Sequence, residues 1–341
     1  MATNEELAAL VQGEHTDAVI ALEQAVAAQA AGQVEEEFEA LSRSTVAAWV
    51  AAFGSVEALA VSGATLRRIL KAVRAAVRRL LGPLGPRAQA AIGGSLAAAV
   101  LLGARQHEAF VSAVRGRRTS GVPTRPNRTL RDAAAAAPGI VAGRRDRALS
   151  LLRPQVVRRW TDVLTGIGAA RSALPAVRAH VAWVINQAVN HGLVAGIRAI
   201  GARKLWVAEA DACVNCAAYA GLVVDVGEPF PGGLSWDPTQ RGRTEPIDAP
   251  PLHPHCRCRT VAWKDAWAVD GLPSLPEALT REARRSVARG WSLPTESGAA
   301  RIRAARELLR TVAGLPESVE EYAALAVRQG RFADRTVPTG P

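Results

Sequence analysis

Four cysteines form two tight pairs in a chain that contains no other cysteine. The 341-residue sequence places Cys213 and Cys216 in "DACVNCAAYA", and Cys256 and Cys258 in "PPLHPHCRCRT". A Cys-x-x-Cys pair puts two sulfurs on one tight turn, and residues at i and i+2 of an extended chain point to the same face. Four thiolates around one Zn²⁺ would complete a tetrahedral site. The pattern therefore predicts a structural zinc centre.

A histidine offers a second set of ligands. His253-x-x-Cys256 repeats the spacing of the Cys213-x-x-Cys216 pair. A site built from these four residues, with Cys258 as a bystander, is also chemically reasonable. The spacing leaves both sets open, and His255 ranks last because it would reach the site only if the chain bends.

Two interpretations without a metal compete with this one. The cysteines could be packed as buried free thiols, or they could form disulfides. Disulfides are disfavoured because a bond within Cys-x-Cys is strained and the cytoplasm is reducing. Of the two, metal-free packing is the stronger competitor.

Catalytic motifs are largely missing from the sequence. It contains no His-x-Glu ahead of the cysteines, no Gly-x-Ser-x-Gly and no Gly-x-x-x-x-Gly-Lys, which argues against a zinc deaminase, an α/β-hydrolase and a P-loop enzyme. The alternative enzyme hypothesis is a metal-dependent nuclease. It would use His253 and His255 with carboxylates from Glu209, Asp211 or Asp225.

The region around the cysteines resembles the signature of the Mu F-like phage minor head proteins, also called head morphogenesis proteins. The resemblance spans residues 176–265, and His stands at position 255, where the family most often has Asn. The matching residues are Trp206, Asp211, Cys213, Cys216, Gly221, Pro250, Pro251, Leu252, His253, Pro254, Cys256, Arg257 and Cys258.

This resemblance implies a minor structural component of a tailed-phage head and no enzymatic activity. Such a protein is recruited through the portal protein to the capsid interior, is present in few copies, and acts in head assembly or in DNA packaging and ejection. The expected location is the inside of the virion head, after assembly in the host cytoplasm. The expected partners are the portal protein, packaged double-stranded DNA and further copies of the chain around the portal, with no membrane.

The net charge of +11 is unevenly distributed. Residues 1–57 hold ten acidic residues and one basic residue, whereas residues 58–131 hold fourteen basic residues and one acidic residue. We expect the basic block to bind DNA, an acidic surface of the portal or capsid, or the acidic segment 1–57 of the same or a neighbouring chain. The candidate binding residues are Arg67, Lys71, Arg74 and Arg78 on one helix face, and Arg115, Arg117 and Arg118 beyond it, followed by Arg125 and Arg128.

The pattern of apolar residues predicts an α+β fold that is predominantly α-helical. We expect a helical region over 1–115, a linker over 116–150, a minor head domain with the Cys/His cluster over 151–270, and C-terminal helices with a tail over 271–341. Short strands are expected at 204–208, 222–226 and 259–263. The uncharged run 88–104 is short and rich in alanine, so we expect a buried helix there and not a membrane span.

Overall fold

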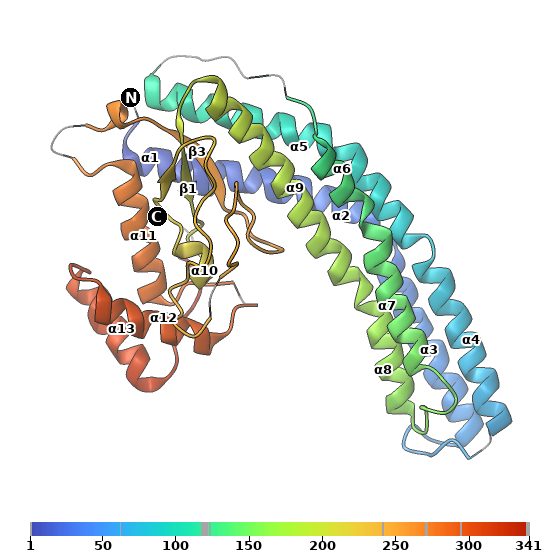
Figure 1. Cartoon of the computed structure of the whole chain (residues 1–341). Coiled ribbons are helices and arrows are strands. Elements are labelled where there is room, and N and C mark those ends of the chain that lie inside the picture. The colour runs from blue at the N-terminus through green and yellow to red at the C-terminus, as the bar shows by residue number, and fades with distance from the viewer. Residues whose placement is uncertain are drawn as a thin grey trace. The chain divides into compact units, whose positions relative to one another are not determined.

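The computed structural model describes residues 2–61, 63–116, 122, 124–240, 242–269, 272–293 and 295–338. It confirms a predominantly helical α+β fold with one small sheet (Figure 1). The described chain divides into two compact units. Unit 1 contains residues 1–20, 97–126 and 186–341, and unit 2 contains residues 21–96 and 127–185. Three helices, α2 (His15–Ala31), α5 (Leu84–Arg115) and α9 (Ala173–Ala199), contribute to both units.

Among the described residues of unit 2, the secondary structure consists of helices joined by turns and loops. Besides parts of α2, α5 and α9, it contains α3 (Val34–Phe53), α4 (Gly63–Leu81), α6 (Arg128–Ala135), α7 (Ala137–Leu151) and α8 (Trp160–Arg171). The helix α4 has an apolar stripe that is buried, because Leu66, Leu70, Val73, Val77 and Leu81 are each at most 4% exposed.

The linker that we expected over 116–150 is wrong for most of its length, because much of that stretch is helical. Residues 128–151 form α6 and α7, separated only by a turn. Asn127 caps α6, since its Oδ1 accepts a hydrogen bond from Leu130 N at 2.9 Å. Small apolar residues at helical spacing are buried between the arginines: Leu130, Ala134, Ala137, Val141 and Ala148. Alanine buries little area per residue, so this pattern was hard to distinguish from an exposed Arg-rich segment.

Unit 1 contains the sheet predicted from the sequence. Its strands are β1 (Arg203–Val207), β2 (Val223–Val224) and β3 (Arg259–Trp263), in the antiparallel order β2-β1-β3. The helix α1 (Asn4–Ala9) and the π-helix η1 (Leu10–Glu14) place Leu7 and Val11 in one apolar cluster with Leu205 and Val261 of the sheet. Residues from the N-terminal end of the chain therefore pack on the sheet, whereas Cys216, Cys256 and Cys258 lie in a second cluster with Trp206.

Two glycines allow α5 and α9 to approach closely within unit 1. A Cβ on Gly103 would lie 2.0 Å from the carbonyl oxygen of Val189, and a Cβ on Gly192 would lie 2.1 Å from that of Val100. The stretch Gly63–Arg115, which includes the run 88–104, is long and apolar enough to cross a membrane by length and composition, and 44% of its most apolar window is buried in the protein. Such a helix is also common in protein cores.

The long segment between β2 and β3 is held at several points. Phe230 and Ile247 form an antiparallel bridge, and the ring of Phe230 packs against Trp206 with centroids 5.0 Å apart. Lys204 Nζ donates a hydrogen bond to Asp248 O at 2.8 Å. These contacts hold the middle and the end of the segment between β2 and β3.

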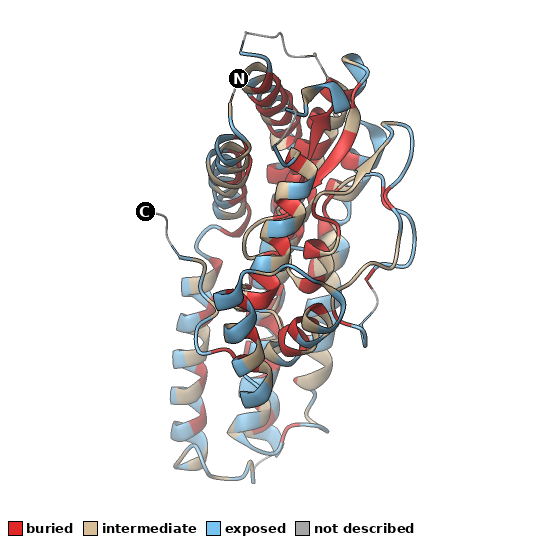
Figure 2. Cartoon of the chain, turned by 90° about the vertical axis from the view of Figure 1, so that its left-hand side faces the viewer, coloured by how far each residue is buried: buried red, intermediate tan, exposed pale blue. Residues whose placement is uncertain are grey.

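The C-terminal helices are α11 (Leu275–Arg289), α12 (Gly298–Thr311) and α13 (Glu317–Gln329), and the short 3-10 helix η2 (Asp265–Trp267) precedes them. The first two were predicted from the sequence, but α13 lies where a polar tail was expected. Val319, Ala323 and Ala326 of α13 are buried at helical spacing. Colouring by burial shows buried residues along the sheet and alternating with exposed residues along several of the helices (Figure 2).

Candidate metal centre

The two cysteine pairs and one histidine converge in unit 1. His253 Nε2 lies 3.1 Å from Cys213 Sγ and 3.3 Å from Cys216 Sγ, and Cys216 Sγ lies 3.5 Å from Cys256 Sγ. The donors form two groups, Cys213–Cys216–His253 and Cys216–Cys256–Cys258, with all ligand atoms of a group within 4.8 Å of one another. All four cysteines are free thiols, which contradicts the disulfide interpretation. The structure therefore has a Cys/His cluster that could hold a metal ion.

The first pair lies on the short helix α10 (Val214–Ala217) below the sheet (Figure 1). Cys213 is the N-cap of this helix, and its Sγ accepts a hydrogen bond from Cys216 N at 3.4 Å. This turn points both sulfurs to one side, as a Cys-x-x-Cys metal knuckle requires.

The second pair of donors is formed by a matching turn. Cys256 N donates to His253 O at 3.0 Å, which closes the turn His253–Cys256. His255 lies within it, exposed and with φ 62°, so the turn needs a left-handed residue at this position. Its side chain is absent from both donor groups.

Replacement of His255 by glycine is expected to raise the free energy of unfolding of the metal-loaded protein by about 0.5–1 kcal/mol, because glycine adopts positive φ without a steric penalty. Asparagine should be neutral or mildly stabilising, and alanine should be the least stable of the three variants. Chemical denaturation with zinc present measures all three. An alanine variant as stable as the glycine variant would contradict the proposed strain at residue 255.

His253 is oriented as a metal ligand would be. Its Nδ1 lies 2.7 Å from Pro254 O, so Nδ1–H donates to this carbonyl and Nε2 faces the sulfurs. Metal-bound histidines commonly donate their second ring N–H to a carbonyl or carboxylate, which fixes the tautomer. Burial opposes protonation of this imidazole, but the hydrogen bond with Cys213 raises the pKa of His253 to about 9.

The cluster stabilises two of its thiols as thiolates. Hydrogen bonds from Cys216 and then His253 hold the pKa of Cys213 well below its usual value, although burial opposes this. Burial also opposes ionisation of Cys256, but hydrogen bonds from Cys216 and Cys258 hold the pKa of Cys256 well below the ordinary thiol value. Thiolates are the metal-binding form of cysteine, so Cys213 and Cys256 are prepared for a metal, whereas hydrogen bonds with Cys213 and Cys256 raise the pKa of Cys216, which would release its proton on binding.

Two asparagines that sequence reasoning missed hold the second knuckle in place. Asn186 Nδ2 donates to Cys256 O at 2.5 Å, and Asn190 Nδ2 donates to Cys258 O at 3.2 Å. Asn190 Oδ1 also accepts from Thr260 N at 3.0 Å. Both amides are at most 1% exposed on the otherwise apolar inner face of α9. The sequence did contain a signal for them, because two asparagines at i and i+4 among apolar residues of a helix share one face.

The carboxylates considered for an enzyme do not assemble into a second set of ligands among the described residues. Glu209 Oε1 accepts a hydrogen bond from Thr16 Oγ1 at 3.3 Å, and Asp225 is exposed. Burial raises the pKa of Glu209 to about 8 against the opposing charge of Arg259. Glu209 is thus engaged with the start of α2, and His255 is exposed on the turn.

The structure brings only part of the predicted basic set together. Arg67, Lys71 and Arg78 are exposed on α4 and Arg74 is half-buried there, all in unit 2. Arg115 ends α5 in unit 1, and Arg117 and Arg118 lie outside the described residues.

Comparison with known proteins adds no relative. The chain matches no protein-family model, no curated protein and no solved structure.

Proposed function

We propose that this chain is a minor head protein of a tailed phage in which the Cys/His cluster holds one structural zinc ion. The observation that carries the proposal is that His253 Nε2 lies 3.1 Å from Cys213 Sγ and 3.3 Å from Cys216 Sγ. These three donors belong to the residues that resemble the Mu F-like signature. His253 lies 40 positions after Cys213 and 37 positions after Cys216 in the sequence.

The proposed ligands are Cys213, Cys216, His253 and Cys256. The hydrogen bond from His253 Nδ1 to Pro254 O leaves Nε2 for the metal, which favours the set that includes histidine. Cys258 would then be a buried neighbour, 2% exposed, that contacts Cys216 and Cys256.

A structural role fits this donor set better than a catalytic one. Catalytic zinc sites keep one coordination position open for water, whereas sites with four Cys and His ligands are closed. Cys216 and Cys256 are at most 4% exposed. A metal held here would join the turn before the long 227–252 segment to the turn after it, which stabilises a sheet of only three short strands.

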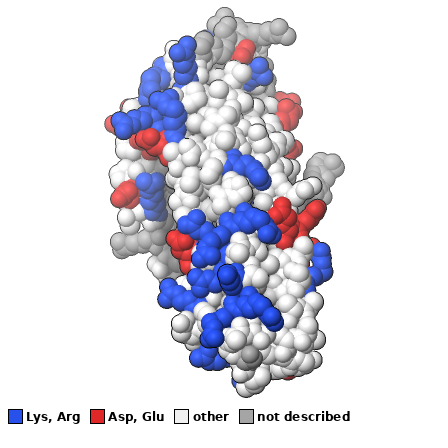
Figure 3. Space-filling view, turned by 90° about the vertical axis from the view of Figure 1, so that its right-hand side faces the viewer, with Lys and Arg blue, Asp and Glu red and all other residues white. Residues whose placement is uncertain are grey.

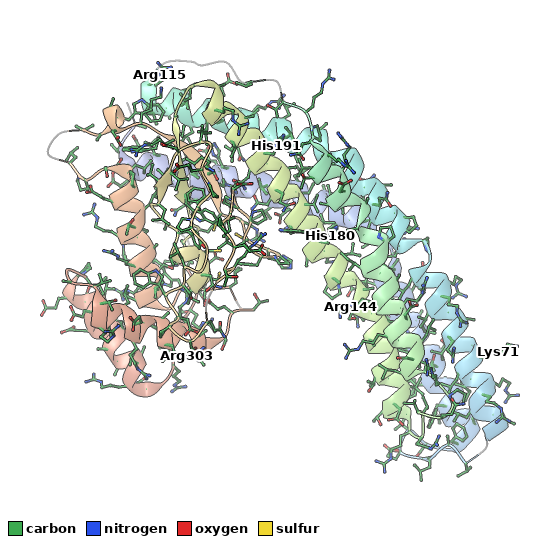
Figure 4. All side chains as sticks on the ribbon, viewed as in Figure 1. Lys71, Arg115, Arg144, His180, His191 and Arg303 are labelled. Carbon is green, nitrogen blue, oxygen red and sulfur yellow. The ribbon has the colours of Figure 1, made fainter. Side chains whose placement is uncertain are left out.

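The basic face of α4 is the proposed contact with packaged DNA. Lys and Arg side chains gather over the part of the surface where α4 lies (Figure 3). Lys71 points outward from this helix, and Arg144 of α7 lies on the other side of unit 2 in the same view (Figure 4). Among the described residues, Arg67, Lys71, Arg74 and Arg78 have no ion pair within 4.0 Å.

The acidic segment has other partners, which weakens the self-pairing alternative. Glu35 of α3 pairs with Arg171 at 3.0 Å and with Arg178 at 2.7 Å. Glu39 contacts Arg171 at 3.6 Å and Arg43 at 4.0 Å. These carboxylates neutralise α8 and α9 and leave the α4 cations for an external polyanion such as DNA or an acidic virion surface.

Heads purified from the phage that encodes this chain are expected to contain it in a few copies, and heads assembled without the portal protein are expected to lack it. The resemblance implies that recruitment proceeds through the portal. Quantitative mass spectrometry of both kinds of head, with the major capsid protein as internal reference, makes the measurement. Equal incorporation without the portal would overturn the proposed route of recruitment. Absence of the chain from complete heads would overturn the proposed function.

A further inference from the structure

A buried ion pair near the C-terminal helices forms hydrogen bonds with the backbone on both sides of Cys213, in the first knuckle (Cys213–Cys216). Arg301 of α12 is fully buried, and its Nη2 donates to Ala212 O at 2.8 Å and to Trp291 O. Glu296, just before α12, accepts a hydrogen bond from Val214 N through Oε1 at 2.8 Å. Arg301 Nη2 and Glu296 Oε2 are 3.0 Å apart. Ala212 is thus bound to Arg301 and Val214 to Glu296, and these two side chains form an ion pair with each other.

This arrangement costs free energy unless it has a specific partner. An arginine with no exposed side-chain surface has lost its hydration, and a single ion pair seldom repays that cost. The additional hydrogen bonds to two carbonyl oxygens repay part of it. The hydrogen bonds of the pair go to Ala212 O and Val214 N, on either side of Cys213, so the first cysteine turn is the part of the fold that this pair holds.

We infer that Arg301 and Glu296 are positioning residues of the metal centre, so that the C-terminal helices and the bound metal stabilise each other. The inference rests on the proposed metal site. It extends the metal unit beyond residues 176–265, where the resemblance ends, to α11 and α12. Arg301 fixes the carbonyl before Cys213 and Glu296 fixes the N–H after it.

Charge distinguishes the expected effect of Arg301 from that of Glu296. A zinc ion with three thiolates and one neutral imidazole carries a net charge of about −1, and Arg301 is a fully buried cation hydrogen-bonded to the residue before one of these thiolates. Arg301 therefore favours the metal-bound state over the metal-free state. Glu296 contributes through its hydrogen bond to Val214 N, and glutamine keeps an acceptor oxygen for that bond.

The test is zinc affinity of the full chain, measured by competition with a chromophoric chelator. Arg301→Met is expected to weaken zinc binding about 10–100-fold, as loss of an outer partner of a metal ligand commonly does. Arg301→Lys, which keeps the charge, should recover part of the loss and serves if the methionine variant folds poorly. Glu296→Gln is expected to stay within about threefold of the wild type, because its acceptor remains.

A matched control lies two residues away on the same helix. Arg303 pairs with Asp237 at 2.7 Å and has no bond to the knuckle. Arg303→Met should therefore leave zinc affinity unchanged, although it loosens the 227–252 segment.

Denaturation with zinc and with chelator distinguishes positioning from ordinary stabilisation. Arg301→Met is expected to lower the unfolding midpoint more with zinc than without it. Equal losses in both conditions, or an unchanged zinc affinity, would overturn the inference while the metal site stands. A wild-type protein that binds no zinc would instead overturn the proposed metal site.

Discussion

Replacement of Cys216 by serine is expected to reduce the zinc content of the purified protein from about one equivalent per chain to near zero. Cys216 belongs to both donor groups of the cluster, so its loss leaves no complete set of four ligands. In small zinc domains a metal-binding free energy of about 10–16 kcal/mol is also folding free energy. We therefore expect the cooperative unfolding of unit 1 to be lost or shifted strongly to lower denaturant.

Two further variants identify the ligand set. Cys256→Ser should lose zinc as Cys216→Ser does, whereas Cys258→Ser should keep about one equivalent. Elemental analysis of protein purified without chelator measures all three variants and the wild type. If Cys256→Ser retained zinc and Cys258→Ser lost it, the ligand would be Cys258 and the assignment of Cys256 would be wrong. A folded wild type with well under one equivalent would show that the zinc proposal is wrong.

Hydrogen exchange on the Cys216→Ser variant should show where stability is lost. We expect weaker protection in β1, β3, α10 and the 227–252 segment. We also expect it in α1 and the end of α5, because Leu7, Phe110 and Val111 pack in the cluster that contains Leu205 and Val261. The unit 2 helices α3 and α4 should keep their protection. Uniform loss over the chain would contradict this division.

Neutralising the basic face of α4 is expected to weaken binding of nonspecific duplex DNA on the order of 10²-fold at low salt. The variant carries Arg67→Gln, Lys71→Gln and Arg78→Gln, three exposed positions on one helix. Each lost phosphate contact reduces counterion release, so the plot of log affinity against log salt should become shallower by about 2.7. Fluorescence anisotropy at several salt concentrations measures both quantities.

A charge-matched control uses the same unit. Arg144→Gln, Arg147→Gln and Arg153→Gln remove three exposed cations from α7 and the turn after it. This variant should keep most of the affinity, since general net charge acts less strongly than direct phosphate contact. Equal loss in both variants would show that net charge, and not the α4 face, drives binding.

The wild type and one acidic variant decide among the partners. Absence of wild-type binding at low salt would exclude DNA and leave an acidic protein surface or self-pairing. Glu36 and Glu37 are exposed on α3, next to α4. If they mask the basic face, Glu36→Gln with Glu37→Gln should tighten DNA binding. We expect little change, because the ion pairs of the neighbouring Glu35 go to α8 and α9.

The sequence by itself determined the features that depend on local spacing. The apolar stripe of α4 has the period of a helix, and the short β-branched runs have the period of strands, because backbone geometry fixes which side chains share a face. The same rule placed Cys213 beside Cys216 and His253 beside Cys256. It also predicted a helical α+β protein and the candidate donors of one metal site.

Only the tertiary structure decided how distant segments combine. The first twenty residues and the end of α5 belong to the unit that holds the cysteines, which no spacing rule could reveal. Asn186, Asn190, Glu296 and Arg301 acquired their roles from hydrogen bonds to backbone atoms far away in the chain. Backbone oxygens and N–H groups are the same at every residue, so the sequence carries no mark of which one a buried side chain will bind. Packing alone selects it.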